Sequence, residues 1–397
     1  MVARPQEASA RILALRLFRI FCCALVIALL PVYARAVDDP PPSTGELCRL
    51  PAIEEALSRY RLLAAQGGWP PVPAGPALRE GDRNERIPFL RQRLVASSDL
   101  VAPADQEHVF DGILKEAVQR FQLRHGLTAD GLVGAKTLRE LNVPVSERIR
   151  QLALSLERCR LLPPLPERRH ILVNIPDFTL KLFEDDELRF SMPVIVGRYH
   201  RQTPVFNSRI SSLVLNPTWT VPQSIATKDL LPKIKKDPGY LKQSHFRVFR
   251  DWKTNAEIDP ATIDWANLSP ARFPYRLRQD PGPANALGRV KFLLPKPYTA
   301  YLLHDTPARE LFQQDTRALS SGCIRLARPL ELAVYLLEGT PLGSIDALTA
   351  AISGEKTQNL AIPSPIAVYV VYITAWVDLE GIIQFRPDIY RGPAPGI

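Results

Sequence analysis

The stretch HILVNIPDFTLKLF, residues 170–183, marks the point where hydrophobic side chains begin to recur with a period of two. This period, with turn signals between the apolar runs, predicts short consecutive strands. Such a succession favours an antiparallel β architecture over repeated βαβ units. The expected strands are 171–175, 178–183, 190–197 and 210–215.

The sequence before this region has helical spacing instead. Leu114, Ala117, Val118 and Phe121 recur at i, i+3, i+4 and i+7, and Gly126 supplies a signal for the end of that helix. The expected helical segments are 50–65, a small helical unit over 82–143, and 144–162.

The strand rhythm is lost again further along the chain. Residues 227–290 are rich in lysine and proline, and because long ordered loops are usually functional, we expect an insertion there. The later predictions are strands at 290–294 and 298–304, a helix at 329–337, and a hairpin of 366–376 with 382–385.

These patterns predict an α+β protein, in which a β-rich domain with an inserted capping subdomain is joined to a small three-helix domain. A chain of 397 residues, 46% of them hydrophobic, is long enough for two cores. The expected parts are an export signal at 1–36, a helical segment and linker at 37–81, the helical domain at 82–143, a connecting helix at 144–167, the β-rich domain at 168–345 with its insertion at about 227–290, and C-terminal strands and tail at 346–397.

The N-terminus has the form of an export signal. Arginines precede the apolar run IFCCALVIALLPV, residues 20–32, and Ala34-Arg35-Ala36 resembles a cleavage site. We expect a cleaved signal that sends the chain to the periplasm; an uncleaved inner-membrane anchor is the alternative. The net charge of +9 suits an anionic polymer. Because no compact Lys/Arg run with interleaved aromatic residues is present, nucleic-acid binding is not expected.

The five cysteines suggest one disulfide and one thiol. Cys22 and Cys23 lie in the signal, which leaves an odd number for an oxidising compartment. We expect a Cys48–Cys159 disulfide, because each lies in a helix-like segment beside the small domain, and a reduced Cys323. No cysteine pair has metal-ligand spacing and no histidine clusters with cysteines, so neither a metal nor a cofactor is expected.

A candidate active site lies in LHDTP, residues 303–307, and SSGCIR, residues 320–325. The thiolate is the reactive form of cysteine, so Cys323 needs a nearby base, and His304 at a strand end could supply both a base and a positive charge. A lone cysteine is more often a small buried hydrophobic residue than a nucleophile. The combination of a thiol in an exported chain, a Ser-Gly-Cys turn and an upstream histidine favours catalysis.

Three neighbours complete this predicted site. The backbone N–H groups of Gly322 and Cys323 could form an oxyanion hole. Arg325 adds positive charge, for a thiolate or for a substrate carboxylate. The backbone carbonyl of Asp305 could accept the second N–H of the His304 ring and so orient it.

The histidine followed by Ser-x-Gly-Cys-x-Arg resembles the signature of the L,D-transpeptidase (YkuD-type) family. The large periplasmic subgroup of that family is similar beyond the signature, over residues 50–390. The similar segments are GR at 197–198, RQTPVF at 201–206, NPTWTVP at 216–222, GPANALGRVKF at 282–292 and HDTP at 304–307.

The resemblance implies the fold, the reaction and further site residues. Residues 121–142 resemble the peptidoglycan-binding three-helix module, and a spacer that binds nothing is the alternative. The implied reaction acylates Cys323 with a tetrapeptide stem, releases D-Ala and joins the stem to a diaminopimelate amine as a 3→3 cross-link. Carbapenems are expected to acylate the same sulfur, and other wall-synthesis proteins are candidate partners. The implied substrate-binding residues are Ser321, Tyr301, Asn216 and Trp219.

The sequence departs from the family pattern near the histidine. The approach Tyr301-Leu302-Leu303-His304 is one residue longer than usual, so a β-bulge is needed to keep His304 inward. Two other functions remain open. A hydrolase of wall peptides would share the acyl-enzyme and use water as acceptor, and a wall-binding scaffold would have an unreactive Cys323.

Overall fold

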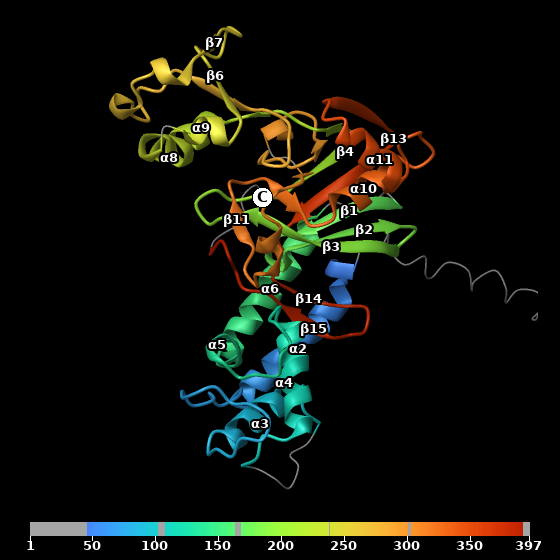
Figure 1. The fold of residues 1–397 in the computed structure, drawn as a ribbon. Helices are drawn as coiled ribbons and strands as arrows, with labels where there is room; N and C mark the ends of the chain where they lie inside the picture. Colours follow the sequence, from blue (N-terminus) through green and yellow to red (C-terminus); the bar gives the residue numbers. More distant parts are fainter. Residues whose placement is uncertain (1–45, 102–107, 163–167, 238, 301–302, 392–397) are drawn as a thin grey trace, which may run out of the picture.

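The computed structural model describes residues 46–101, 108–162, 168–237, 239–300 and 303–391 (Figure 1). The expected export signal, Tyr301 and the β-bulge expected before His304 lie outside these residues. Among the described residues, no helix combines the length and the hydrophobicity that a membrane crossing requires.

The centre of the molecule is a nine-stranded sheet that closes on itself. The strand order is β11-β3-β12-β10-β9-β4-β13-β1-β2, and a further pairing of β2 with β3 completes the ring. Hydrophobic side chains from these strands fill its interior, including Ile171, Leu180 and Phe292. The strands are β1 Arg169–Asn174, β2 Thr179–Glu184, β3 Glu187–Gly197, β4 Phe206–Leu215, β9 Val290–Leu293, β10 Leu303–His304, β11 Ala318–Ser320, β12 Ile324–Leu326 and β13 Gln358–Val371.

The expected antiparallel architecture holds for most strand pairs but not for all, because the sheet is mixed. β1 pairs with β13 in parallel, as do β10 with β12 and β11 with β3. In β1, Ile171 and Val173 face the sheet interior while Leu172 packs in a second core outside it. A strand buried on both faces has a continuous apolar run, and such a run does not specify the direction of its neighbours.

The insertion after β4 is a subdomain with its own core, which we call the cap (residues 219–279). Its four-stranded sheet has the order β5-β8-β6-β7, and its core includes Val221, Ile234 and Leu277. The strands escaped the sequence analysis because they are only two to four residues long. The cap elements are β5 Trp219–Thr220, α7 Gln223–Ile225, a π-helical turn Ala226–Leu230, α8 Leu231–Lys236, α9 Tyr240–Gln243, β6 Phe246–Phe249, β7 Glu257–Ile258 and β8 Arg276–Gln279.

The C-terminal region differs from the predicted hairpin of 366–376 with 382–385. Most of the first segment belongs to β13, which lies between β4 and β1 in the main sheet. The hairpin is smaller and consists of β14 Ala375–Val377 and β15 Ile383–Phe385. The very apolar sequence reflects burial of β13 on both faces. Two helices precede it, α10 Pro329–Leu336 and α11 Ile345–Ser353, of which only the first was predicted.

The helical part lies at the opposite end of the molecule from the cap (Figure 1). Its small core includes Leu90, Leu114 and Phe121, at the positions that helical spacing predicted. The α+β fold class, with a β-rich domain and an N-terminal helical region, is thus confirmed. The helices are α2 Leu50–Ala65, α3 Ile87–Ala96, α4 Gly112–Arg124, α5 Ala135–Leu141 and α6 Val145–Leu161.

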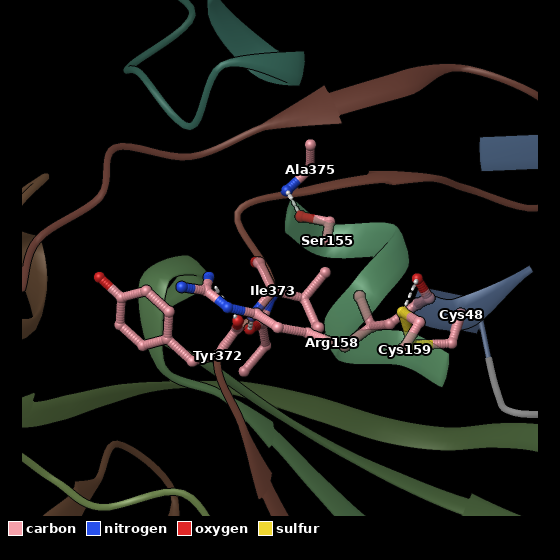
Figure 2. Close-up of a disulfide and its surroundings, with 9 residues drawn as sticks. Cys48, Ser155, Arg158, Cys159, Tyr372, Ile373 and Ala375 are labelled. Carbon is pink, nitrogen blue, oxygen red and sulfur yellow. Dashed lines mark hydrogen bonds between the residues drawn. A yellow bond between two sulfur atoms is a disulfide. The ribbon is translucent and has the colours of Figure 1, made fainter. Parts of the chain in front are cut away.

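A disulfide fixes α6 to the start of the described chain. Cys48 and Cys159, the expected pair, are bonded with their Cα atoms 5.4 Å apart (Figure 2). On the same helix, Arg158 Nη1 donates to the Tyr372 carbonyl at 3.1 Å, and Ser155 Oγ accepts from Ala375 N–H at 3.0 Å (Figure 2). The disulfide-bonded helix therefore holds the segment between β13 and β14.

Replacing both Cys48 and Cys159 with serine is expected to lower the free energy of unfolding by about 2–5 kcal/mol, because the bond closes a long loop of the unfolded chain. The two cysteines are 111 residues apart. Thermal and urea unfolding of the variant would measure the loss, with Cys323→Ser as the control for removing a thiol. Equal stability of the double variant and the wild type would contradict this role.

Candidate active site

The pairing of β10 with β12 brings the predicted catalytic residues together. These strands run in parallel with His304 opposite Arg325, and Cys323 directly precedes β12. Paired residues on neighbouring strands point to the same face, and so do residues two apart on one strand. His304, Cys323 and Arg325 accordingly line one cavity of about 810 Å³.

The His304 ring is buried and oriented by its neighbour's backbone. Its Nδ1 lies 2.5 Å from the carbonyl oxygen of Asp305, which is the contact predicted from the sequence. A carbonyl only accepts hydrogen bonds, so Nδ1 carries the proton, and Nε2 of the neutral ring keeps its lone pair. This is the tautomer that a general base needs.

The position of Asp305 is fixed by hydrogen bonds and an ion pair to its side-chain carboxylate. One carboxylate oxygen accepts from Arg289 N–H and the other from Thr306 N–H, each at 2.7 Å, and the Arg309 guanidinium also binds the carboxylate. Gly288 has a φ of +61°, and a Cβ there would lie 2.3 Å from Asp305 Cγ. A glycine is therefore required for this close approach.

Burial, followed by the positive charge of Arg325, lowers the pKa of His304 to about 3, although the hydrogen bond to Asp305 opposes the shift. His304 is thus neutral near pH 7. The sequence analysis expected it to supply both a base and a positive charge, and the structure supports only the base. Burial lowers the pKa of Arg325, but interaction with Cys323 raises it, so Arg325 is the charge that favours a thiolate.

The turn that carries Cys323 is fixed from two sides. Gly322 adopts a φ of +112°, which favours glycine. Ser320 Oγ donates to the Cys323 carbonyl at 2.6 Å and accepts from Gly322 N–H at 3.1 Å. From the β3–β4 connection, Thr203 Oγ1 donates to the Gly322 carbonyl at 2.9 Å.

This arrangement corrects the predicted oxyanion hole. The Gly322 N–H is occupied by the Ser320 hydroxyl, so it could serve as an oxyanion donor only by exchanging that bond. The sequence did not reveal this competition, because Ser320 acts through a local turn geometry.

A second set of contacts joins the turn to the cap. Arg201 Nη1 donates to Ser321 Oγ at 2.8 Å and also forms an ion pair with Asp229 in the π-helical turn. The predicted role of Ser321 in substrate binding is untested, but its hydroxyl is engaged with Arg201. The sequence analysis assigned no role to Arg201 or Thr203, although both lie in RQTPVF, residues 201–206, a segment of family resemblance.

The predicted substrate-binding residues Trp219 and Asn216 lie in different places. Trp219 lines the cavity. Asn216 does not, because it is fully buried and its Nδ2 donates to the carbonyls of Ile352 at 2.8 Å and Lys356 at 3.4 Å. Its φ of +46° ends β4. The prediction for Asn216 is therefore wrong, since the side chain holds the end of α11 in place.

Comparison with known families agrees with this geometry. Residues 168–342 match the L,D-transpeptidase catalytic domain family (YkuD), and residues 83–141 match the family described as "Putative peptidoglycan binding domain". The β-rich part of this chain is therefore the part that is similar to the L,D-transpeptidase catalytic domain family.

A curated relative and two solved structures illustrate the similarity. A Haemophilus influenzae protein named "Putative L,D-transpeptidase" is 39% identical over 240 residues, which are 60% of this chain. The chain spans about half the length of that relative (47%). An L,D-transpeptidase from Stackebrandtia nassauensis is 13% identical, with a TM-score of 0.27 over 76% of this chain and 96% of its own. An L,D-transpeptidase from Xylanimonas cellulosilytica is 11% identical, with a TM-score of 0.21 over 75% of this chain and 99% of its own.

Burial of neutral His304 makes stability depend on pH. Because the folded pKa of about 3 lies below the usual 6.5, the unfolded chain binds a proton between these values and the folded chain does not. The stability of the wild type therefore falls as the pH drops through this window. When the pH falls from 6.5 to 5, the free energy of unfolding of His304→Gln is expected to decrease by about 2 kcal/mol less than that of the wild type.

Urea unfolding at several pH values would measure this difference. The exposed His200 provides a matched control, since His200→Gln is expected to keep the wild-type slope. If the free energy of unfolding changed with pH in the same way for His304→Gln and the wild type, the claim that His304 is buried in its neutral form would be refuted.

Thr203 is expected to position the nucleophile. Its hydroxyl bonds both Gly197 N–H at 2.8 Å and the Gly322 carbonyl. Thr203→Val keeps the shape but removes both bonds, so acylation of Cys323 by a carbapenem is expected to slow about tenfold, the effect of losing about 1.4 kcal/mol in the transition state. Thr203→Ser keeps the hydroxyl and should restore most of the rate. Equal rates for the valine variant and the wild type would exclude this role.

Proposed function

We propose that this protein is an exported L,D-transpeptidase that forms 3→3 cross-links in peptidoglycan through a Cys323 acyl-enzyme. One observation carries the proposal: a neutral, oriented imidazole, a cysteine and a partly buried guanidinium line the same cavity beneath a cap. This set of groups suits acyl transfer by a thiol.

In the first half-reaction, His304 Nε2 accepts the Cys323 proton as sulfur attacks the carbonyl carbon before the terminal D-Ala of a tetrapeptide stem. A C–S bond forms and the C–N bond then breaks. The departing D-Ala amine takes the proton from Nε2. Arg325 stabilises the negative charge that develops beside sulfur.

In the second half-reaction, the side-chain amine of a neighbouring diaminopimelate attacks the thioester. Nε2 accepts the amine proton, the C–S bond breaks and sulfur recovers the proton from His304. The products are a 3→3 cross-linked dimer and the original thiol. The chain supplies both proton transfers through one ring nitrogen.

Hydrolysis by water is the alternative second half-reaction, and it would yield a tripeptide. The cap forms one wall of the cavity, through Trp219, Lys233, Tyr240 and Phe246. A covered site limits the access of water to the thioester, which favours an amine acceptor.

Two other features support action in the cell wall. The disulfide Cys48–Cys159 suits an oxidising compartment such as the periplasm. The small helical domain, with its match to a peptidoglycan-binding family, would hold the enzyme near its polymer. Both the location and this binding are part of the proposal, as are contacts with other wall-synthesis proteins.

Incubation of the full chain with a disaccharide-tetrapeptide tests the proposal. Mass spectrometry is expected to show a cross-linked dimer and released D-Ala, with an acyl adduct on Cys323, because transfer proceeds through the thioester. Cys323→Ala should give neither adduct nor dimer, and His304→Gln should reduce both by at least about a hundredfold. Tripeptide without dimer would favour hydrolysis, and an unreactive wild type would favour the scaffold function.

A further inference from the structure

The lining of the cavity that contains Cys323 is rich in unbalanced positive charge. Its lining includes four cations, Arg198, Lys228, Lys233 and Arg325, but among the described residues its lining includes one carboxylate, Asp229. That carboxylate is already neutralised by Arg201. The cavity therefore attracts anions more strongly than the modest charge of the whole chain implies.

The two lysines lie on the cap and line the same cavity as Cys323. Lys228 belongs to the π-helical turn, and Lys233 to α8, where its Nζ lies 5.6 Å from the centroid of the Tyr240 ring. Both side chains are exposed to the cavity solvent. No carboxylate within the described residues forms a salt bridge with either lysine. A ligand anion is the natural partner for them.

The cap contacts fix where these charges lie relative to the nucleophile. Asp229 directly follows Lys228, and its ion pair with Arg201 continues to Ser321, two residues before Cys323. π-Helical turns are rare and are frequent at functional sites. The contacts of Arg201 with Asp229 and Ser321 therefore fix the position of the Lys228 backbone relative to the turn that carries Cys323.

We propose that Lys228 and Lys233 form a carboxylate-binding subsite for the stem peptide on the cap side of the cavity. The ligand class is an acidic peptide, in which a free carboxylate of the diaminopimelate residue binds the lysines while the reacting group reaches Cys323. Trp219 and Tyr240, which line the same wall, pack against the aliphatic parts of the stem. The subsite makes the enzyme selective for stems whose diaminopimelate carboxylate is free rather than amidated. This inference rests on the proposed function for its substrate.

Direct binding separates the inference from catalysis. Tetrapeptide stems with a free or an amidated diaminopimelate carboxylate would be titrated into the full-length Cys323→Ala protein by calorimetry. The free-acid stem is expected to bind about tenfold more tightly, and added salt should reduce the difference. The double variant Lys228→Gln/Lys233→Gln should remove the preference for the free-acid stem, because it lowers the affinity for that stem and leaves the affinity for the amidated stem unchanged.

Lys236→Gln is the matched control. Lys236 is an exposed lysine on α8, the helix of Lys233, but it does not line the cavity. This variant should keep the wild-type preference. Alkylation of Cys323 by the uncharged reagent iodoacetamide should proceed at the wild-type rate in the double lysine variant, which shows that the nucleophile is intact.

Equal affinity for both stems, or an unchanged preference in the double lysine variant, would overturn the subsite. These outcomes leave the proposed transfer reaction standing, because turnover of the wild type is measured independently. Failure of the wild type to form any dimer, with the binding preference present, would instead overturn only the transfer reaction.

Discussion

The chemistry depends on the parallel pairing of two very short strands. β10 contributes His304, and β12 contributes Arg325 with Cys323 just before it. The alternation of side chains in extended backbone places His304 and Arg325 on one face, with Cys323 directly before the strand of Arg325. The rest of the closed sheet keeps these two strands in register, since β9 pairs with β10 and β3 with β12.

Charge and hydrogen bonding determine the protonation of His304, the charge of Arg325 and the rigidity of the turn that carries Cys323. Burial and the nearby guanidinium keep the resting His304 ring neutral near pH 7, so its Nε2 lone pair is free to accept a proton. The guanidinium, by contrast, stays charged and lies near the sulfur. The turn of Cys323 adds rigidity, because Ser320 and Thr203 bind its backbone from different elements. The C-terminal segment contributes as well, since Tyr390 Oη accepts from Thr203 N–H at 3.1 Å and donates to the Gly197 carbonyl at 2.7 Å.

Local patterns in the sequence predicted the helices, several strands and the two segments that bring His304 and Cys323 to one cavity, because periodicity and short motifs are local properties. Contacts between distant segments were not predictable in this way. Asn216 lies in a segment of family resemblance, yet it binds carbonyls about 140 residues away. The strands of the cap sheet are too short to show a period. The apolar sequence of β13, which is buried on both faces, was interpreted as one strand of a hairpin. The bond between Ser320 and Gly322 N–H depends on a turn conformation that composition does not specify.

The most direct test of the account is the protonation state of the His304 ring, observed by ¹⁵N NMR at pH 7 in protein labelled at histidine. The account predicts a neutral ring with a protonated Nδ1 and an unprotonated Nε2, whose resonance changes when Cys323 is alkylated. An imidazolium with both nitrogens protonated, the opposite tautomer, or an Nε2 resonance unaffected by alkylation would contradict it.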